Sequence, residues 1–194
     1  MNDTLTRRRL GARQFARTAG LAGIAANVLL AVFFASGEAW RSVPGTFAWS
    51  GPVNDVLVAI QFAALVPVAV AVRAPLAARA FGLAAMTGVV VLQALLLAGA
   101  LDFETQVWWV VGCFVVVFVW ILAVSTTHLP RTVARAGTVI GAAYLAGALL
   151  VWGALALPSE SPAQYAVGGL GLVAGLVGWL GLPVWCLMLA RTPR

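Results

Sequence analysis

Six apolar segments of about 20 residues recur along this chain, and each is long enough to span a hydrocarbon core of ~30 Å. Their approximate bounds are residues 15–36, 53–72, 77–101, 106–127, 135–157 and 164–190. None has the alternating pattern of a barrel strand, and helices are the other structure that satisfies every backbone hydrogen bond in lipid. Only 9% of the residues are charged, whereas a soluble domain usually carries about a quarter. The sequence therefore predicts an all-α integral membrane protein, a single domain over residues 1–194 in which six spans form antiparallel hairpins.

The arginines lie almost entirely on one side of these spans. All twelve basic residues are arginine, and eleven flank alternate ends of the apolar segments: Arg7, Arg8, Arg9, Arg13, Arg17, Arg73, Arg79, Arg131, Arg135, Arg191 and Arg194. The opposite side holds Arg41 with five acids, namely Glu38, Asp55, Asp102, Glu104 and Glu160. Since arginine-rich short loops stay in the cytoplasm, both termini are predicted to be cytoplasmic. The absence of lysine is typical of a GC-rich genome, which indicates a bacterial plasma (inner) membrane.

Two alternatives concern the organisation of the chain. Arg7-Arg8-Arg9 before an apolar stretch is typical of a signal peptide, with Ala35-Ser36-Gly37 as a cleavage site. That stretch is longer than the usual 7–15 residues, so we expect it to remain as the first span. The arginine that opens each outward-running span, with an acid at its far end, also fits three repeated hairpins. The orientation bias alone explains the same pattern.

Glycines on the last two spans predict close helix packing. Gly168, Gly171, Gly175 and Gly178 recur at steps of three and four, which places them on one helical face. Gly137 and Gly141 share a face of the fifth span. Small residues let helix backbones approach in lipid, so we expect these two faces to meet within one chain. A homodimer seam is the alternative.

Three deep amides are candidate site residues. Asn27, Gln61 and Gln93 lie one in each of the first three spans. A lone amide in hydrocarbon is costly, so each is expected to face a neighbouring helix or a polar cavity. Interhelical hydrogen bonds of ~0.6 kcal/mol each are the simpler interpretation. The functional interpretation is a polar pocket for a lipid headgroup or a weakly polar solute.

Ionisable and catalytic residues are scarce in this sequence. No Asp, Glu, Lys, Arg or His occurs in the central part of a span, which argues against a pump or an ion-coupled symporter. Asp102 and Glu104 form a poor cation site and are expected to be solvated charges at a helix N-terminus. His128 has no nearby cysteine or acid, and the sequence contains no phosphate-binding loop or zinc motif. We therefore predict no catalytic residue, no bound metal, no cofactor and no enzyme activity.

The tryptophans divide into two groups. A belt at the acidic boundary is expected from Trp40, Trp49, Trp108, Trp109 and Trp152. Trp120, Trp179 and Trp185 lie deeper, where an indole N–H needs a partner. The belt supports the architecture and selects no ligand.

The segment Leu129-Pro130-Arg131, followed by a Gly-rich stretch from Gly137 to Leu145, resembles an uncharacterised family of small bacterial multi-pass membrane proteins. In that family a Leu-Pro-Arg turn likewise precedes the fifth of six helices. The resemblance covers the fifth span and its preceding turn, and Arg17-Thr18-Ala19-Gly20-Leu21 also looks similar. It implies the same six-helix fold and brings no activity.

The predicted function is that of a non-enzymatic accessory bundle that binds lipid or a partner. The expected partners are membrane lipid and another membrane protein or a second copy of the chain. Nucleic acid is not expected, because the arginines are spread over four separate segments. The alternative is a facilitative transporter or exporter of a small, weakly polar or hydrophobic solute, without ion coupling.

Overall fold

The computed structural model describes the backbone of residues 2–192 and the side chains of residues 11–192. Within that range it contains helices and no strand: α1 (Asn2–Ala35), the 3-10 helix η1 (Glu38–Trp40), α2 (Ser50–Ala71), α3 (Leu76–Leu97), α4 (Phe103–Ser125), α5 (Arg131–Leu155) and α6 (Pro162–Arg191). The six α-helices are each long and apolar enough to cross a membrane, which confirms the predicted all-helical, six-helix class. The side chains of Arg7, Arg8 and Arg9, and the whole of Arg194, lie outside the described residues.

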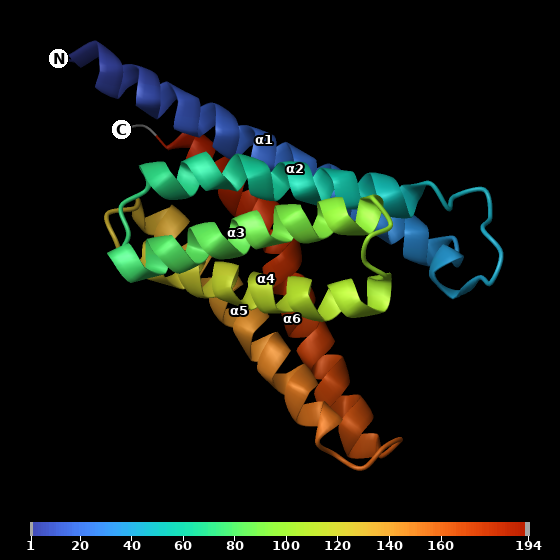
Figure 1. The fold of residues 1–194 in the computed structure, drawn as a ribbon. Helices are drawn as coiled ribbons and strands as arrows, with labels where there is room; N and C mark the ends of the chain where they lie inside the picture. The colour runs from blue at the N-terminus through green and yellow to red at the C-terminus, as the bar shows by residue number, and fades with distance from the viewer. Residues whose placement is uncertain (1, 193–194) are drawn as a thin grey trace.

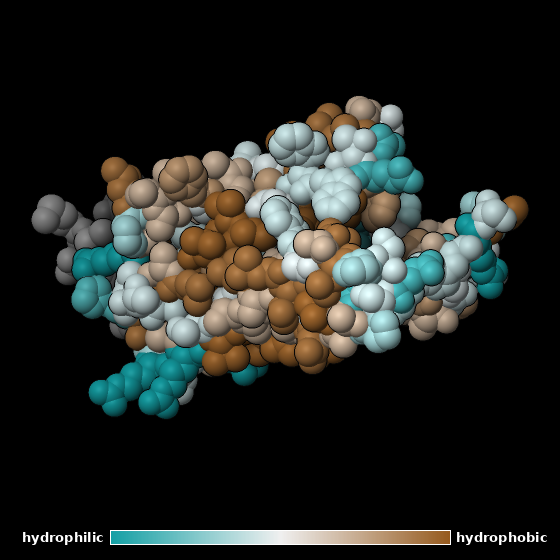
Figure 2. Space-filling model, turned by 90° about the horizontal axis from the view of Figure 1, so that it is seen from below, coloured by the Kyte–Doolittle hydropathy of each residue, from teal (hydrophilic) through white to brown (hydrophobic). Residues whose placement is uncertain are grey.

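Each helix packs against its neighbours in sequence, and α6 returns to pack against α1. The six helices therefore form a closed cycle of contacts (Figure 1). The start of α1, the end of α6 and the α2–α3 and α4–α5 connections lie at one end, which we call the arginine end. The α1–α2 and α3–α4 connections lie at the other, the acidic end. Hydrophobic side chains fill the middle of the face in Figure 2, and hydrophilic ones gather toward its ends.

Local chemistry explains where several helices begin and end. Pro75 and Pro130 precede α3 and α5, where the missing proline N–H costs no helical hydrogen bond. α3 ends at Leu97, before the predicted residue 101, because Gly99 turns the chain with a φ of +69°. α2 begins at Ser50, three residues before the predicted span of about 53–72, so Asn54 and Asp55 lie inside its first turns.

Asp102 begins α4 as its N-cap. Its carboxylate accepts a hydrogen bond of 2.7 Å from the backbone N–H of Thr105 and one of 2.9 Å from the Thr105 hydroxyl. Such a cap satisfies a donor that the helix itself leaves free. The predicted role of this carboxylate at a helix N-terminus is confirmed.

Replacing Asp102 with alanine is expected to lower the melting temperature slightly at neutral pH. The hydrogen bonds from Thr105, first that of its backbone N–H, hold the pKa of Asp102 below its ordinary value. The stabilisation is therefore full above the ordinary aspartate pKa of about 3.9 and is lost as the pH falls through the lower folded pKa. Thermal unfolding at several pH values measures the effect, with Glu104→Ala as the control. If both variants lowered the melting temperature equally, or if the loss in Asp102→Ala grew at acidic pH, Asp102 would not stabilise the protein as a helix cap.

Aromatic side chains fill the middle of the cycle. Phe114 of α4 packs against Trp179 of α6 at a centroid distance of 4.6 Å and against Phe62 of α2 at 5.3 Å. Toward the arginine end, Trp120 meets Trp185 edge to face at 6.0 Å. Three helices that are not neighbours in the cycle are thus joined through their side chains.

Toward the acidic end the α5–α6 hairpin diverges sideways from the other helices. In Figure 1 the acidic-end halves of both helices, and the connection between them, lie below α4. α5 meets α4 where the Phe118 and Tyr144 rings stack at 4.0 Å. α6 meets α1 where Gly20 and Gly23 face Pro183. Nearer the acidic end, Leu172 and Leu176 of α6 are exposed. The hairpin is therefore held to the bundle by its arginine-end half.

Candidate functional site

Gln61, one of the three predicted amides, lies at the interface of α1 and α2. A Cβ atom at Gly23 of α1 would lie 2.6 Å from Nε2 of Gln61 and 2.7 Å from the Pro183 ring of α6. Gly23 therefore provides the space in which the buried Gln61 side chain lies. Asn27 follows one turn later on the same face of α1 and is half-buried.

The third amide, Gln93, lies at a different level. Measured along the antiparallel α2–α3 hairpin, it is seven residues, or about 10 Å, nearer the acidic end than Gln61. It extends the buried stripe of α3 that includes Met86 and Val89. The structure thus places Gln61 against Gly23, one turn from Asn27 on α1, and Gln93 at a separate level.

A fourth buried amide, Gln106 of α4, accompanies Gln93. Gln106 is only 2% exposed, and it begins a buried stripe that continues with Val110 and Phe114. Sequence reasoning missed it because it lies in the first turn of its helix, where a polar residue is ordinary. Its spacing of four residues from Val110 was the signal that it faces inward.

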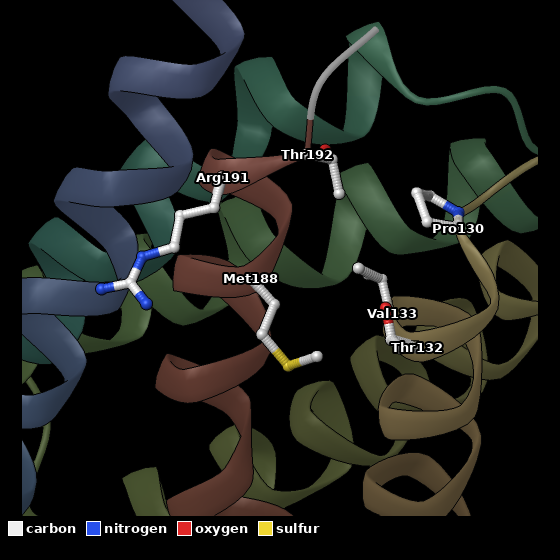
Figure 3. A pocket seen from close by; sticks show the side chains of 6 residues that line it. All are labelled: Pro130, Thr132, Val133, Met188, Arg191 and Thr192. Atoms are coloured by element: carbon white, nitrogen blue, oxygen red, sulfur yellow. The ribbon is translucent and has the colours of Figure 1, made fainter.

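One hollow opens at the arginine end, between the start of α5 and the end of α6. It is an open depression of about 330 Å³, lined by Pro130, Thr132, Val133, Met188, Arg191 and Thr192. In Figure 3 the guanidinium of Arg191 points toward α1, away from Pro130 and Thr132, while Met188 lies between α6 and α5. The wall of the hollow is therefore mainly apolar, with a charge at its edge.

The end of α6 beside this hollow is tied to α1. Arg13 donates a hydrogen bond of 2.6 Å to the backbone carbonyl of Thr192, and the Thr192 hydroxyl donates to the carbonyl of Leu189. A cation here also interacts favourably with the negative end of the helix dipole. Arg13 thus has a structural contact in addition to its contribution to the charge bias.

A second hollow of about 300 Å³ lies between α3 and α4, lined by Ala78, Phe81, Val116, Val119 and Trp120. Gly82 allows the Trp120 ring to lie against α3, since a Cβ at Gly82 would be 2.6 Å from it. The indole N–H of Trp120 is buried and has no partner among the described residues. The residues that line this hollow are therefore apolar apart from the indole N–H of Trp120.

The predicted glycine faces contact more than one helix. Gly171 and Gly178 of α6 meet α5: a Cβ at Gly171 would lie 2.8 Å from the Val151 nitrogen, and one at Gly178 2.8 Å from that of Tyr144. Gly168 is looser, with Ala154 at 3.5 Å, and a Cβ at Gly175 would meet nothing within 4 Å.

On α5, Gly141 faces Leu122 of α4, and Gly137 lies between Ser125 of α4 and Trp185 of α6. Gly147, which the spacing argument did not include, meets the backbones of Gly171 and Gly175. The α5–α6 contact is therefore centred on Gly147, and part of the α5 face packs on α4.

The loop between α1 and α2 is organised around the buried carboxylate of Glu38. This carboxylate accepts hydrogen bonds from the backbone N–H groups of Gly45 at 2.8 Å and Phe47 at 3.3 Å. Trp40 and Trp49 of the same loop are exposed. The loop thus holds a fixed shape while it presents indole rings outward.

Replacing Glu38 with alanine is expected to increase amide hydrogen exchange at Gly45 and Phe47, because both N–H groups lose their acceptor. Glu104→Ala removes an exposed carboxylate at the same end and should leave that exchange unchanged. Hydrogen–deuterium exchange read by mass spectrometry measures the difference. Unchanged protection in the Glu38 variant would mean that the loop shape does not depend on this carboxylate.

Residues that could support catalysis or metal binding are dispersed. Over the described part of the chain, no three His, Cys, Asp or Glu side chains come close enough to hold a metal ion. Cys113 is half-buried, Cys186 is buried, and both are free thiols. The features that remain as candidate sites are the two apolar hollows and the buried amides.

Comparison with known proteins gave no match to a family model, to a curated protein or to a solved structure.

Proposed function

We propose that this protein crosses a bacterial plasma membrane six times, with its arginine end and both termini in the cytoplasm. Six helices of sufficient length and apolar composition support the membrane placement. The grouping of arginines at one end supports the orientation, since arginine-rich short loops resist translocation. Exposed Trp108, Trp109 and Trp152 toward the acidic end match an interfacial aromatic belt.

Within that membrane we infer a non-enzymatic role, as a bundle that binds lipid or a partner protein. The observation that carries this proposal is the position of the two apolar hollows in the bundle. The two hollows lie toward the arginine end with mainly apolar walls, whereas Phe62, Phe114 and Trp179 fill the middle of the bundle. An apolar hollow with an arginine at its edge suits an acyl chain whose headgroup carries a phosphate.

Purification from native membrane, with mass spectrometry of bound lipid and protein, tests this role. Ala78→Phe fills the hollow between α3 and α4, and Ala77→Phe places the same ring on an exposed neighbouring position. We expect the Ala78 variant to lose a lipid or partner that the wild type and the Ala77 variant retain. An identical set of bound molecules in all three proteins would contradict a role for this hollow.

The alternative function is facilitative transport of a small, weakly polar or hydrophobic solute. The observation in its favour is that Gln93 Oε1, Gln106 Nε2 and Trp179 Nε1 are buried without a hydrogen-bond partner among the described residues. Solute flux into proteoliposomes tests it, with and without a pH or sodium gradient. Because the span centres carry no ionisable side chain except those of Tyr and Cys, any flux should be independent of both gradients. Accumulation of a solute driven by either gradient would contradict both the binding role and the uncoupled transport.

A further inference from the structure

Gln93 and Gln106 each bury a polar atom that has no hydrogen-bond partner among the described residues. The side chains are 5% and 2% exposed, and the unpartnered atoms are the carbonyl Oε1 of Gln93 and the amide Nε2 of Gln106. Buried polar atoms in proteins are nearly always hydrogen-bonded, because an unsatisfied one costs the full desolvation penalty. Two such atoms on adjacent helices therefore indicate a ligand.

The two glutamines lie at similar levels of the α3–α4 interface. Gly82 faces Trp120 and Gly88 faces Cys113, and these contacts set the register of the antiparallel pair. Continuing that register toward the acidic end brings Gln93 and Gln106 within about one helical turn, or ~5 Å along the axis. Both belong to stripes that point into the bundle, next to Val89 and Val110 respectively.

We propose that Gln93 and Gln106 bind one water molecule between them. The unpartnered atoms are of opposite kind, an acceptor on Gln93 and a donor on Gln106. A water molecule donates to the first and accepts from the second, and buried waters are typically held by two to four polar groups of this kind. No charged residue occurs on either buried stripe, so a neutral ligand fits and an ion does not. This site is independent of the proposed lipid or partner binding.

Radiolytic hydroxyl-radical footprinting of the full-length protein in detergent tests the site directly. Radicals formed from a bound water label side chains beside it even where bulk solvent has no access. We expect labelling at Val89 and Val110, which are buried one turn inward from the two glutamines. Val117, which is fully buried like Val89 but lies deeper along α4, should remain unlabelled. Absence of label at Val89 and Val110 in the wild type would overturn the proposal.

Paired substitutions provide the control. Q93L and Q106L keep a side chain of similar bulk and remove hydrogen bonding, and in the double variant the labelling should fall to the level of Val117. Each single variant should have a lower melting temperature than the double variant, because it leaves one buried amide without a partner. A direct contact is the competing arrangement. A high-resolution map with Gln93 Oε1 and Gln106 Nε2 about 3 Å apart would overturn the water-bridged site.

Discussion

Replacing Gly147 with alanine is expected to destabilise the protein by about 1–3 kcal/mol, and replacing it with leucine by more. A Cβ at this position would lie 2.6 Å from the Gly171 carbonyl oxygen and 2.7 Å from the Gly175 Cα. Both are backbone atoms, so no side chain can move aside to make room. The two helices must separate and forfeit contacts of ~0.1–0.2 kcal/mol for each atom pair along their length.

Gly153 provides the matched control on the same helix. A Cβ there would meet nothing within 4 Å, so Gly153→Ala should leave stability unchanged or raise it slightly through helix propensity. Thermal unfolding in detergent, followed by tryptophan fluorescence, compares the two variants. Equal melting temperatures for them would show that α5 and α6 do not approach as closely as described.

Replacing Trp185 with alanine is expected to cost about 3–5 kcal/mol, the usual range for removing a buried tryptophan or phenylalanine. Trp185 is fully buried, packs edge to face with Trp120 and donates a 3.1 Å hydrogen bond to the backbone carbonyl of Val133. It therefore links α6 to both α4 and α5. Trp185→Phe keeps most of the packing and loses the hydrogen bond, so a smaller loss is expected.

Trp152 is the control for this substitution. It is 60% exposed near the acidic end of α5, so Trp152→Ala removes an indole of the same size without opening an internal cavity. Its melting temperature should stay close to that of the wild type, while that of Trp185→Ala falls strongly. A comparable loss at both positions would contradict the central role of Trp185.

Local sequence patterns were sufficient to predict the helices. Each span is a continuous apolar run, and the prolines and glycines between runs interrupt helical hydrogen bonding wherever the chain folds. The predicted start of α2, near residue 53, was three residues late: Asn54-Asp55 is a typical helix start, but Ser50 and Asn54 are both buried inside the helix.

Packing contacts could be predicted only in part. Spacing of three and four residues places Gly171 and Gly175 on one broad face, but the way two helices cross decides which Cβ position points at the partner. Gly171 meets α5, whereas a Cβ at Gly175 points into open space. The bond from Trp185 to Val133 joins residues 52 positions apart, and no local pattern indicates it.

The candidate site was the least predictable part. The sequence identified Asn27, Gln61 and Gln93 as deep amides, because each interrupts an apolar run. It could not assign their levels in the bundle or pair Gln93 with Gln106, since those depend on helix register. The hollows likewise arise from side chains of two helices each and have no signature in either helix alone.

The central claim is a six-span membrane protein with its arginine end in the cytoplasm, and single-cysteine labelling tests it most directly. With Cys113 and Cys186 replaced, cysteines are introduced at Leu76 and His128 at the arginine end and at Thr46 and Ser159 at the acidic end. All four positions are exposed. A membrane-impermeant thiol reagent added to intact cells should label positions 46 and 159, and positions 76 and 128 only after the membrane is opened. Labelling of position 76 or 128 in intact cells would contradict the account.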